Sequence, residues 1–112
     1  MRPLPFLAIF LSVATGCQRT PEQEQADNVR SIARQQGASI ENRAGTEADR
    51  LEQQAAILEN EAKQAGGMTG QRLKVRADAL NQEAKIIRKQ ADKQAEAIKE
   101  TADARIKASE SR

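Results

Sequence analysis

The feature that most constrains the fold is the long stretch after Pro21, which contains no further proline and no aromatic side chain. It consists mainly of Ala, Glu, Gln, Lys and Arg, which all favour the helical state. The one sharp break in it is "GGMTG", residues 66–70. We therefore predict an all-α chain with one helix over residues 22–65, a glycine-rich turn over 66–70, a second helix over 71–109 and a frayed tail at 110–112.

Capping residues mark the ends of the predicted helices. Thr20 suits an N-cap, Pro21 the first helical position, and Gln23 completes a Thr-x-x-Gln capping box. Gly66 is typical of a helix C-cap, and Thr69 can cap the helix that follows. The sequence thus predicts a firm helix start at residue 20 and a reversal at the glycines.

The first helix has a weaker zone over residues 37–46. Gly37 and Gly45 each cost about 1 kcal/mol relative to alanine in a helix interior, and Ser39 and Thr46 can each cap a helix that restarts. We predict a kink or fraying in this zone.

Apolar and small residues recur at intervals of eleven along both predicted helices. Eleven residues in three turns is about 3.67 residues per turn, so a supercoil along these rows is nearly straight or slightly right-handed. The longest rows are Val29, Ile40, Leu51 and Ala62, and Leu73, Ala84, Ala95 and Ile106; shorter rows are Ala26, Gly37 and Ala48, then Ala33, Ala44 and Ala55, then Leu80, Ala91 and Ala102.

Folding the chain back at the glycines brings these rows together as a coiled-coil-like antiparallel hairpin of two helices. Facing residues in such a pair have numbers with a constant sum, and a turn centred near Gly67 and Met68 gives 135. Most of the resulting pairs set a large side chain against a small one, which lets the helices pack closely. The pairs are Ala62 with Leu73, Leu51 with Ala84, Ile40 with Ala95, Val29 with Ile106, Leu58 with Ala77, Ala55 with Leu80, Ala48 with Ile87, and Gly37 with Ile98.

Charge is distributed unevenly between the two predicted helices. Residues 18–66 carry six Lys or Arg against nine Asp or Glu, and residues 67–112 carry eleven against seven. The net charges of −3 and +4 indicate two solvated faces, halves that attract each other, or a basic half that meets anionic lipid or another polyanion. Because large apolar side chains are few, we also expect a homo-oligomer or a helical protein partner.

The first seventeen residues, "MRPLPFLAIFLSVATGC", have the three parts of a secretory signal. Arg2 gives a positive start, residues 4–14 an apolar run, and Thr15 and Gly16 the small residues after it. The run is shorter than the roughly 20 residues that cross a bilayer as a helix. Cys17, the single cysteine of the chain, ends this segment.

Ala14-Thr15-Gly16-Cys17 resembles the lipobox of bacterial membrane lipoproteins, in which small residues precede a cysteine. The resemblance implies that residues 1–16 are a cleaved signal peptide and that Cys17 becomes a lipidated membrane anchor, joined to the first helix by a tether over residues 17–21. Gln18, where such proteins often have an inner-membrane Asp, implies the outer membrane facing the periplasm in a Gram-negative cell. The alternative is ordinary secretion, which leaves a free thiol on Cys17.

The residue types that most site chemistry requires are missing. With no His and one Cys, zinc fingers, Cys/His catalysis and Ser-His-Asp triads are excluded, and "GGMTGQR" lacks the ending of a phosphate loop. We expect no catalytic, metal or cofactor site, no small-molecule substrate, and no nucleic acid as a partner, because stacking aromatics are absent. The predicted function is a lipid-anchored envelope protein that acts as a non-catalytic helical structural or interaction module.

The alternative function is that of an amphipathic membrane-surface or stress-protective protein. The segment "ADKQAEAIKETADARIKA" is similar in composition to the eleven-residue repeats of late-embryogenesis-abundant proteins and apolipoproteins. That resemblance implies helices that form on anionic lipid.

Overall fold

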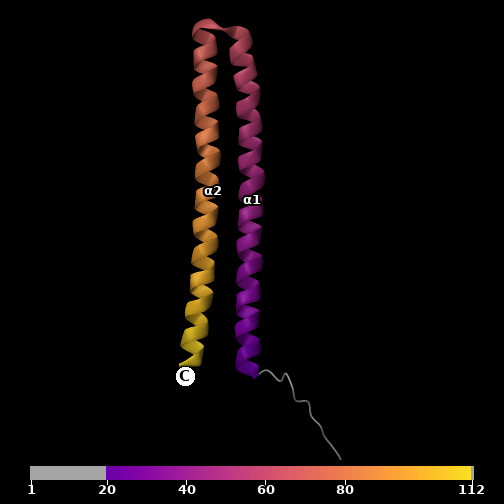
Figure 1. Ribbon diagram of the computed structural model, residues 1–112, viewed down its shortest axis with the longest axis vertical. Coiled ribbons are helices and arrows are strands. Elements are labelled where there is room, and N and C mark those ends of the chain that lie inside the picture. The colour runs from indigo at the N-terminus through magenta and orange to yellow at the C-terminus, as the bar shows by residue number, and fades with distance from the viewer. Residues whose placement is uncertain (1–19, 112) are drawn as a thin grey trace, which may run out of the picture.

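The computed structural model describes residues 20–111, which form two long helices, α1 (Pro21–Ala65) and α2 (Gly67–Glu110). The helices lie side by side, run in opposite directions and are joined at one end through Gly66 (Figure 1). At 1.5 Å per residue each helix is about 65 Å long. The prediction of an all-α antiparallel two-helix hairpin is confirmed. Residues 1–19, with the expected signal segment and Cys17, and Arg112 lie outside the described residues.

The start of α1 has the cap that its sequence predicts. Thr20 is the N-cap, and its hydroxyl accepts a hydrogen bond from the backbone N–H of Gln23 at 3.1 Å. The Gln23 side chain in turn accepts from the N–H of Thr20 at 3.3 Å. Pro21 is the first helical residue, so three local signals agree on where α1 begins.

The prediction of a kink or fraying over residues 37–46 is wrong, because α1 is helical throughout this zone and shows no sharp bend there in Figure 1. Thr46 caps no new helix; its hydroxyl donates to the carbonyl of Asn42, one turn earlier, at 3.0 Å. Gly37 is buried against Ala95 of α2. Packing against the second helix therefore outweighs the low helix propensity of this stretch.

The reversal of the chain is tighter than the predicted turn over residues 66–70. Only Gly66 separates the helices, and Gly67 and Gly70 already belong to the first turns of α2, so Thr69 is not a cap. Gly66 has φ 62° and ψ 178°, a combination that only glycine adopts readily. Its N–H donates to the carbonyl of Ala62 at 3.0 Å, and its carbonyl accepts from Gly70 at 2.9 Å.

Small residues fill the seam between the helices. Apart from two glycines, the buried residues are nine alanines with only Leu51 and Ile106 as larger side chains. Every member of the predicted eleven-residue rows is buried or half-buried. Near the turn, however, the buried positions follow a spacing of seven: Ala48, Ala55 and Ala62 in α1, and Gly70, Ala77, Ala84 and Ala91 in α2.

The closest contacts across the seam differ from the predicted register. Gly37 lies nearest Ala95, rather than Ile98, and Gly70 lies against the carbonyl of Ala62, which was predicted to face Leu73. In both contacts the residue numbers add to 132 instead of 135, a shift of slightly less than one helical turn. Small residues therefore meet small residues at the closest approach.

Candidate functional site

The seam divides the hairpin surface into two long sides of different chemistry. At 100° of rotation per residue, the larger aliphatic side chains of each helix lie about 40–80° to one side of the buried alanines. Because α1 and α2 run in opposite directions, rotation in the same sense about each axis leads to the same side of the hairpin. Two surface clefts lie on opposite sides of the seam. Val29 and Ile98 line one of them, and Arg30 and Lys99 line the other.

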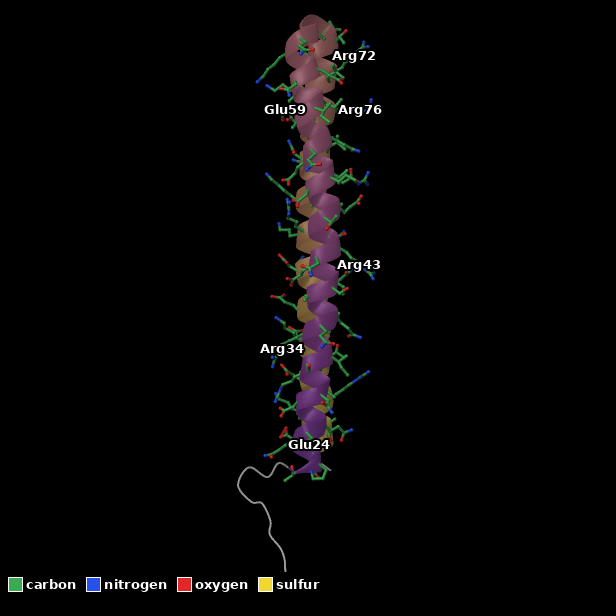
Figure 2. The ribbon with its side chains drawn as sticks, turned by 90° about the vertical axis from the view of Figure 1, so that its right-hand side faces the viewer. Glu24, Arg34, Arg43, Glu59, Arg72 and Arg76 are labelled. Carbon is green, nitrogen blue, oxygen red and sulfur yellow. The ribbon has the colours of Figure 1, made fainter. Side chains whose placement is uncertain are left out.

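Figure 2 views the hairpin from the side, with α1 in front of α2. Arg43, Arg72 and Arg76 project to the right, and Arg34 and Glu59 project to the left. By helical rotation, the larger aliphatic residues turn toward the same side as Arg43, Arg72 and Arg76.

We call the first side the aliphatic side. It carries large apolar residues that the seam does not fully bury, and Leu80 and Ile87 pack on the buried cluster of Ala48, Leu51 and Ala84. A cleft of about 200 Å³ opens on it between α1 and α2, and the half-buried Val29 and Ile98 line it. Its half-buried residues are Val29, Ile40, Leu58, Leu80, Ile87 and Ile98.

We call the opposite side the charged side, and its centre is Arg88 of α2. Arg88 donates through Nη1 to Glu52 Oε2 at 3.0 Å and through Nη2 to Glu52 Oε1 at 2.7 Å, so the pair is bidentate. Nη2 also donates to Asp49 Oδ1 at 2.7 Å. Nearer the open end, Arg30 Nε lies 4.0 Å from Asp103 Oδ1. These contacts join the acidic helix to the basic one.

The contact with Arg88 also changes the acidity of its partner. Hydrogen bonds from the guanidinium lower the pKa of the Glu52 carboxyl below its ordinary value of 4.5, because they favour the charged form. Both groups remain in contact with solvent. The cluster therefore orients two helices at their surface and is screened by salt.

Sequence reasoning named neither Arg88 nor its partners. It did indicate that the acidic and basic halves attract each other, and Asp49 and Glu52 lie within one turn on the acidic helix. The hairpin register places Arg88 at the level of Asp49 and Glu52. The register together with the charge pattern could therefore have predicted this contact.

The described residues offer surfaces rather than an enclosed pocket. Among residues 20–111, no polar or charged side chain is buried and no three His, Cys, Asp or Glu side chains are grouped so that they could hold a metal ion. Neither described helix is long and apolar enough to cross a membrane. At the open end, a cleft of about 210 Å³ lies between the two helices beside Val29 and Ile106.

The one predicted modification site, Cys17, lies outside the described residues, three positions before the N-cap Thr20. The N-terminal end of α1 lies at the open end of the hairpin, beside the C-terminal end of α2 (Figure 1).

Comparison with known proteins gave no relative: no family model, no curated protein and no solved structure matches this chain.

Proposed function

We propose that this protein is a small lipid-anchored envelope protein that works as a non-catalytic helical structural or interaction module. The observation that carries the proposal is the position of the hairpin relative to Cys17. The lipobox-like segment ends only three residues before Thr20, the cap at the open end of the hairpin. A lipid on Cys17 would hold that end at the membrane, and the turn at Gly66 would stand about 65 Å away.

The surface chemistry supports a role in binding other helices rather than in catalysis. The described residues bury no titratable side chain, and the pKa shifts that are resolved belong to exposed ion pairs. Catalytic acids and bases are usually tuned in sites that exclude water. We therefore assign no catalytic, metal, cofactor or nucleic-acid site. The partners are the membrane, through Cys17, and a second copy of the chain or another helical protein.

We place the protein at the outer membrane, facing the periplasm of a Gram-negative cell. The basis is Gln18, which takes the position after the cysteine where an Asp often retains lipoproteins in the inner membrane.

Mass spectrometry of the N-terminal peptide tests the anchor directly. We expect a peptide that begins at Cys17 and carries the mass of a diacylglycerol and an acyl chain. Cys17→Ser should remove the modification and release the protein from the membrane fraction, whereas Thr20→Ser, which keeps the cap, should change neither. An unmodified Cys17 in membrane-bound protein would refute the proposal.

The net positive charge of residues 67–112 favours one competing function, in which the helices form on anionic lipid. Against it, the exposed large apolar residues are scattered along the hairpin as single positions, and the seam is already packed between the helices. Circular dichroism with and without anionic vesicles separates the two functions. Strong helicity without lipid is the result that our proposal requires, and helicity that needs vesicles supports the competing one.

A further inference from the structure

The larger aliphatic side chains of the hairpin have no partner that covers them fully. Alanine and glycine occupy the line of closest approach, so the seam has no room for branched side chains. Those on the flank, such as Ile40, Leu58 and Ile87, are therefore turned to one side and left half-buried. The ion pairs that join the two helices, those of Arg88 and Arg30, lie on the opposite flank, whereas the ion pair within α1 between Arg50 and Glu47 borders the aliphatic flank. The larger aliphatic residues and the ion pairs between the helices are thus on different sides of the hairpin.

We propose that the aliphatic side is a self-association surface, on which a second copy of this chain packs to form a four-helix bundle. The two copies are related by a two-fold axis parallel to the helices, with α1 of each against α2 of the other and both open ends at the same end. This inference rests on the proposed role as an interaction module, and it names the partner and the surface.

The size of the aliphatic side suits a stable dimer. Its half-buried residues run from Val29 to Leu58 along α1, about 44 Å at the helical rise, and two packed helices are roughly 15–20 Å across. Each copy therefore offers on the order of 700–900 Å², and two copies bury about 1,300–1,800 Å² in total. A standard protein–protein interface buries about 1,600 Å².

Charge complementarity identifies a second copy as the occupant. In the proposed arrangement, a residue of α1 in one copy lies at the same level as the residue of α2 in the other copy whose number brings the sum to about 132, as it does within one hairpin. Glu61 then lies opposite Arg72 of the second copy. This pair occurs twice by symmetry, at the rim of the aliphatic side, so two pairs of opposite charge border the interface. Arg50, on the same rim, is already bound to Glu47 of its own helix.

The direction of packing follows from the net charges of the helices. α1 carries nine acidic and five basic residues, and α2 carries seven acidic and ten basic ones. If the second copy were turned end for end, its α1 would pack against α1 of the first copy, and helices with the same sign of net charge would lie side by side. The proposed bundle alternates acidic and basic helices, and it also leaves the two open ends, where the anchors attach, on the same side.

Disulfide cross-linking of the full chain in the membranes of the expressing cells tests this arrangement. Gln54 and Ala79 are exposed residues that lie about 100° and 150° of helical rotation from the buried alanines of their helices, both toward the aliphatic side, and the bundle brings Gln54 of one copy to the level of Ala79 of the other. We expect the variant with Gln54→Cys and Ala79→Cys to form a covalent dimer on mild oxidation. Each single substitution and the unsubstituted chain should remain monomeric on non-reducing gels.

A matched control uses the charged side. Ala56 and Asp78 are exposed, share a level, and each lie about 110° of helical rotation from the buried alanines toward the charged side, so Ala56→Cys with Asp78→Cys should give no dimer. Equal cross-linking of both pairs, no dimer from a folded Gln54/Ala79 variant, or a disulfide adduct with a different protein would each overturn the inference.

The rim charges provide a second measurement that leaves the core untouched. Glu61→Arg should weaken association about tenfold by sedimentation, because it sets like charges against each other at both copies of the pair, and adding Arg72→Glu should restore it. No change in either variant would contradict the proposed register. If the protein in the expressing cells is unlipidated, soluble and dimeric, the proposed anchor is refuted and this inference stands. If the protein is anchored but forms no dimer, this inference is refuted and the anchor stands.

Discussion

The close approach at Gly70 gives the sharpest test of the seam. A Cβ atom added there would lie 2.7 Å from the carbonyl oxygen of Ala62, a distance that forces the backbones apart. Overpacking of this kind costs about 1–3 kcal/mol, whereas replacing glycine by alanine inside a helix gains about 0.8–1 kcal/mol. We therefore expect Gly70→Ala to destabilise the hairpin by about 1 kcal/mol.

Gly45 is the matched control, because it lies in α1 and a Cβ added there meets nothing within 4 Å. Gly45→Ala should show the propensity gain alone, so the two variants should differ by about 2 kcal/mol. For a domain of this size, 1 kcal/mol moves the melting temperature by about 4–8 °C. Thermal unfolding followed by circular dichroism, at one fixed protein concentration, measures both shifts. If Gly70→Ala stabilises the protein as much as Gly45→Ala does, the helices do not approach each other as described.

Four further substitutions test other parts of the hairpin. Gly66→Ala should cost about 1–3 kcal/mol in urea unfolding, because alanine is strained at its backbone angles. Leu51→Ala should cost about 2 kcal/mol by the same measurement, since Leu51 is one of the two large buried side chains. Arg88→Ala should lower the melting temperature at low salt, and a loss that persists unchanged in 1 M salt would contradict an electrostatic origin. The lowered pKa of Glu52 means that its contribution is present above pH 4.5 and is lost as the pH falls through the folded-state value. The melting temperature should therefore fall less steeply below pH 4.5 in Glu52→Gln than in the unsubstituted protein.

Local signals in the sequence were enough to predict the elements. Thr20 and Gln23 fix the start of α1 through contacts only three residues apart, and such contacts can be read from spacing alone. The same holds for the rows of apolar residues, because helical periodicity determines which side chains share a face. The break at the glycines was predicted for the same reason.

The register required information that spacing does not hold. A turn centred near Gly67 and Met68 gave a sum of 135, and the pairing of large residues with small ones in that register is sterically reasonable. A closer packing exists, because Gly70 and Gly37 have no side chain and let the helix backbones approach. The balance between these two registers depends on contacts made by backbone atoms, such as the Ala62 carbonyl, and these contacts exist only once both helices are in place. The prediction of a kink was wrong for the same reason, since the packing of Gly37 against α2 keeps this part of α1 straight.

The composition of the seam also determines which surface remains for a partner. Alanine methyl groups contribute little apolar area when they are buried, so the pairing of α1 with α2 is supported mainly by close backbone approach and by Leu51 and Ile106. The larger aliphatic residues that would normally fill a core lie beside it instead. Covering them from outside would add the apolar burial that the seam lacks. Because they lie on one side, and the ion pairs that join the two helices lie on the other, the aliphatic side is the face of the hairpin that can provide that stabilisation, and the proposed second copy would bring complementary charges to its edges.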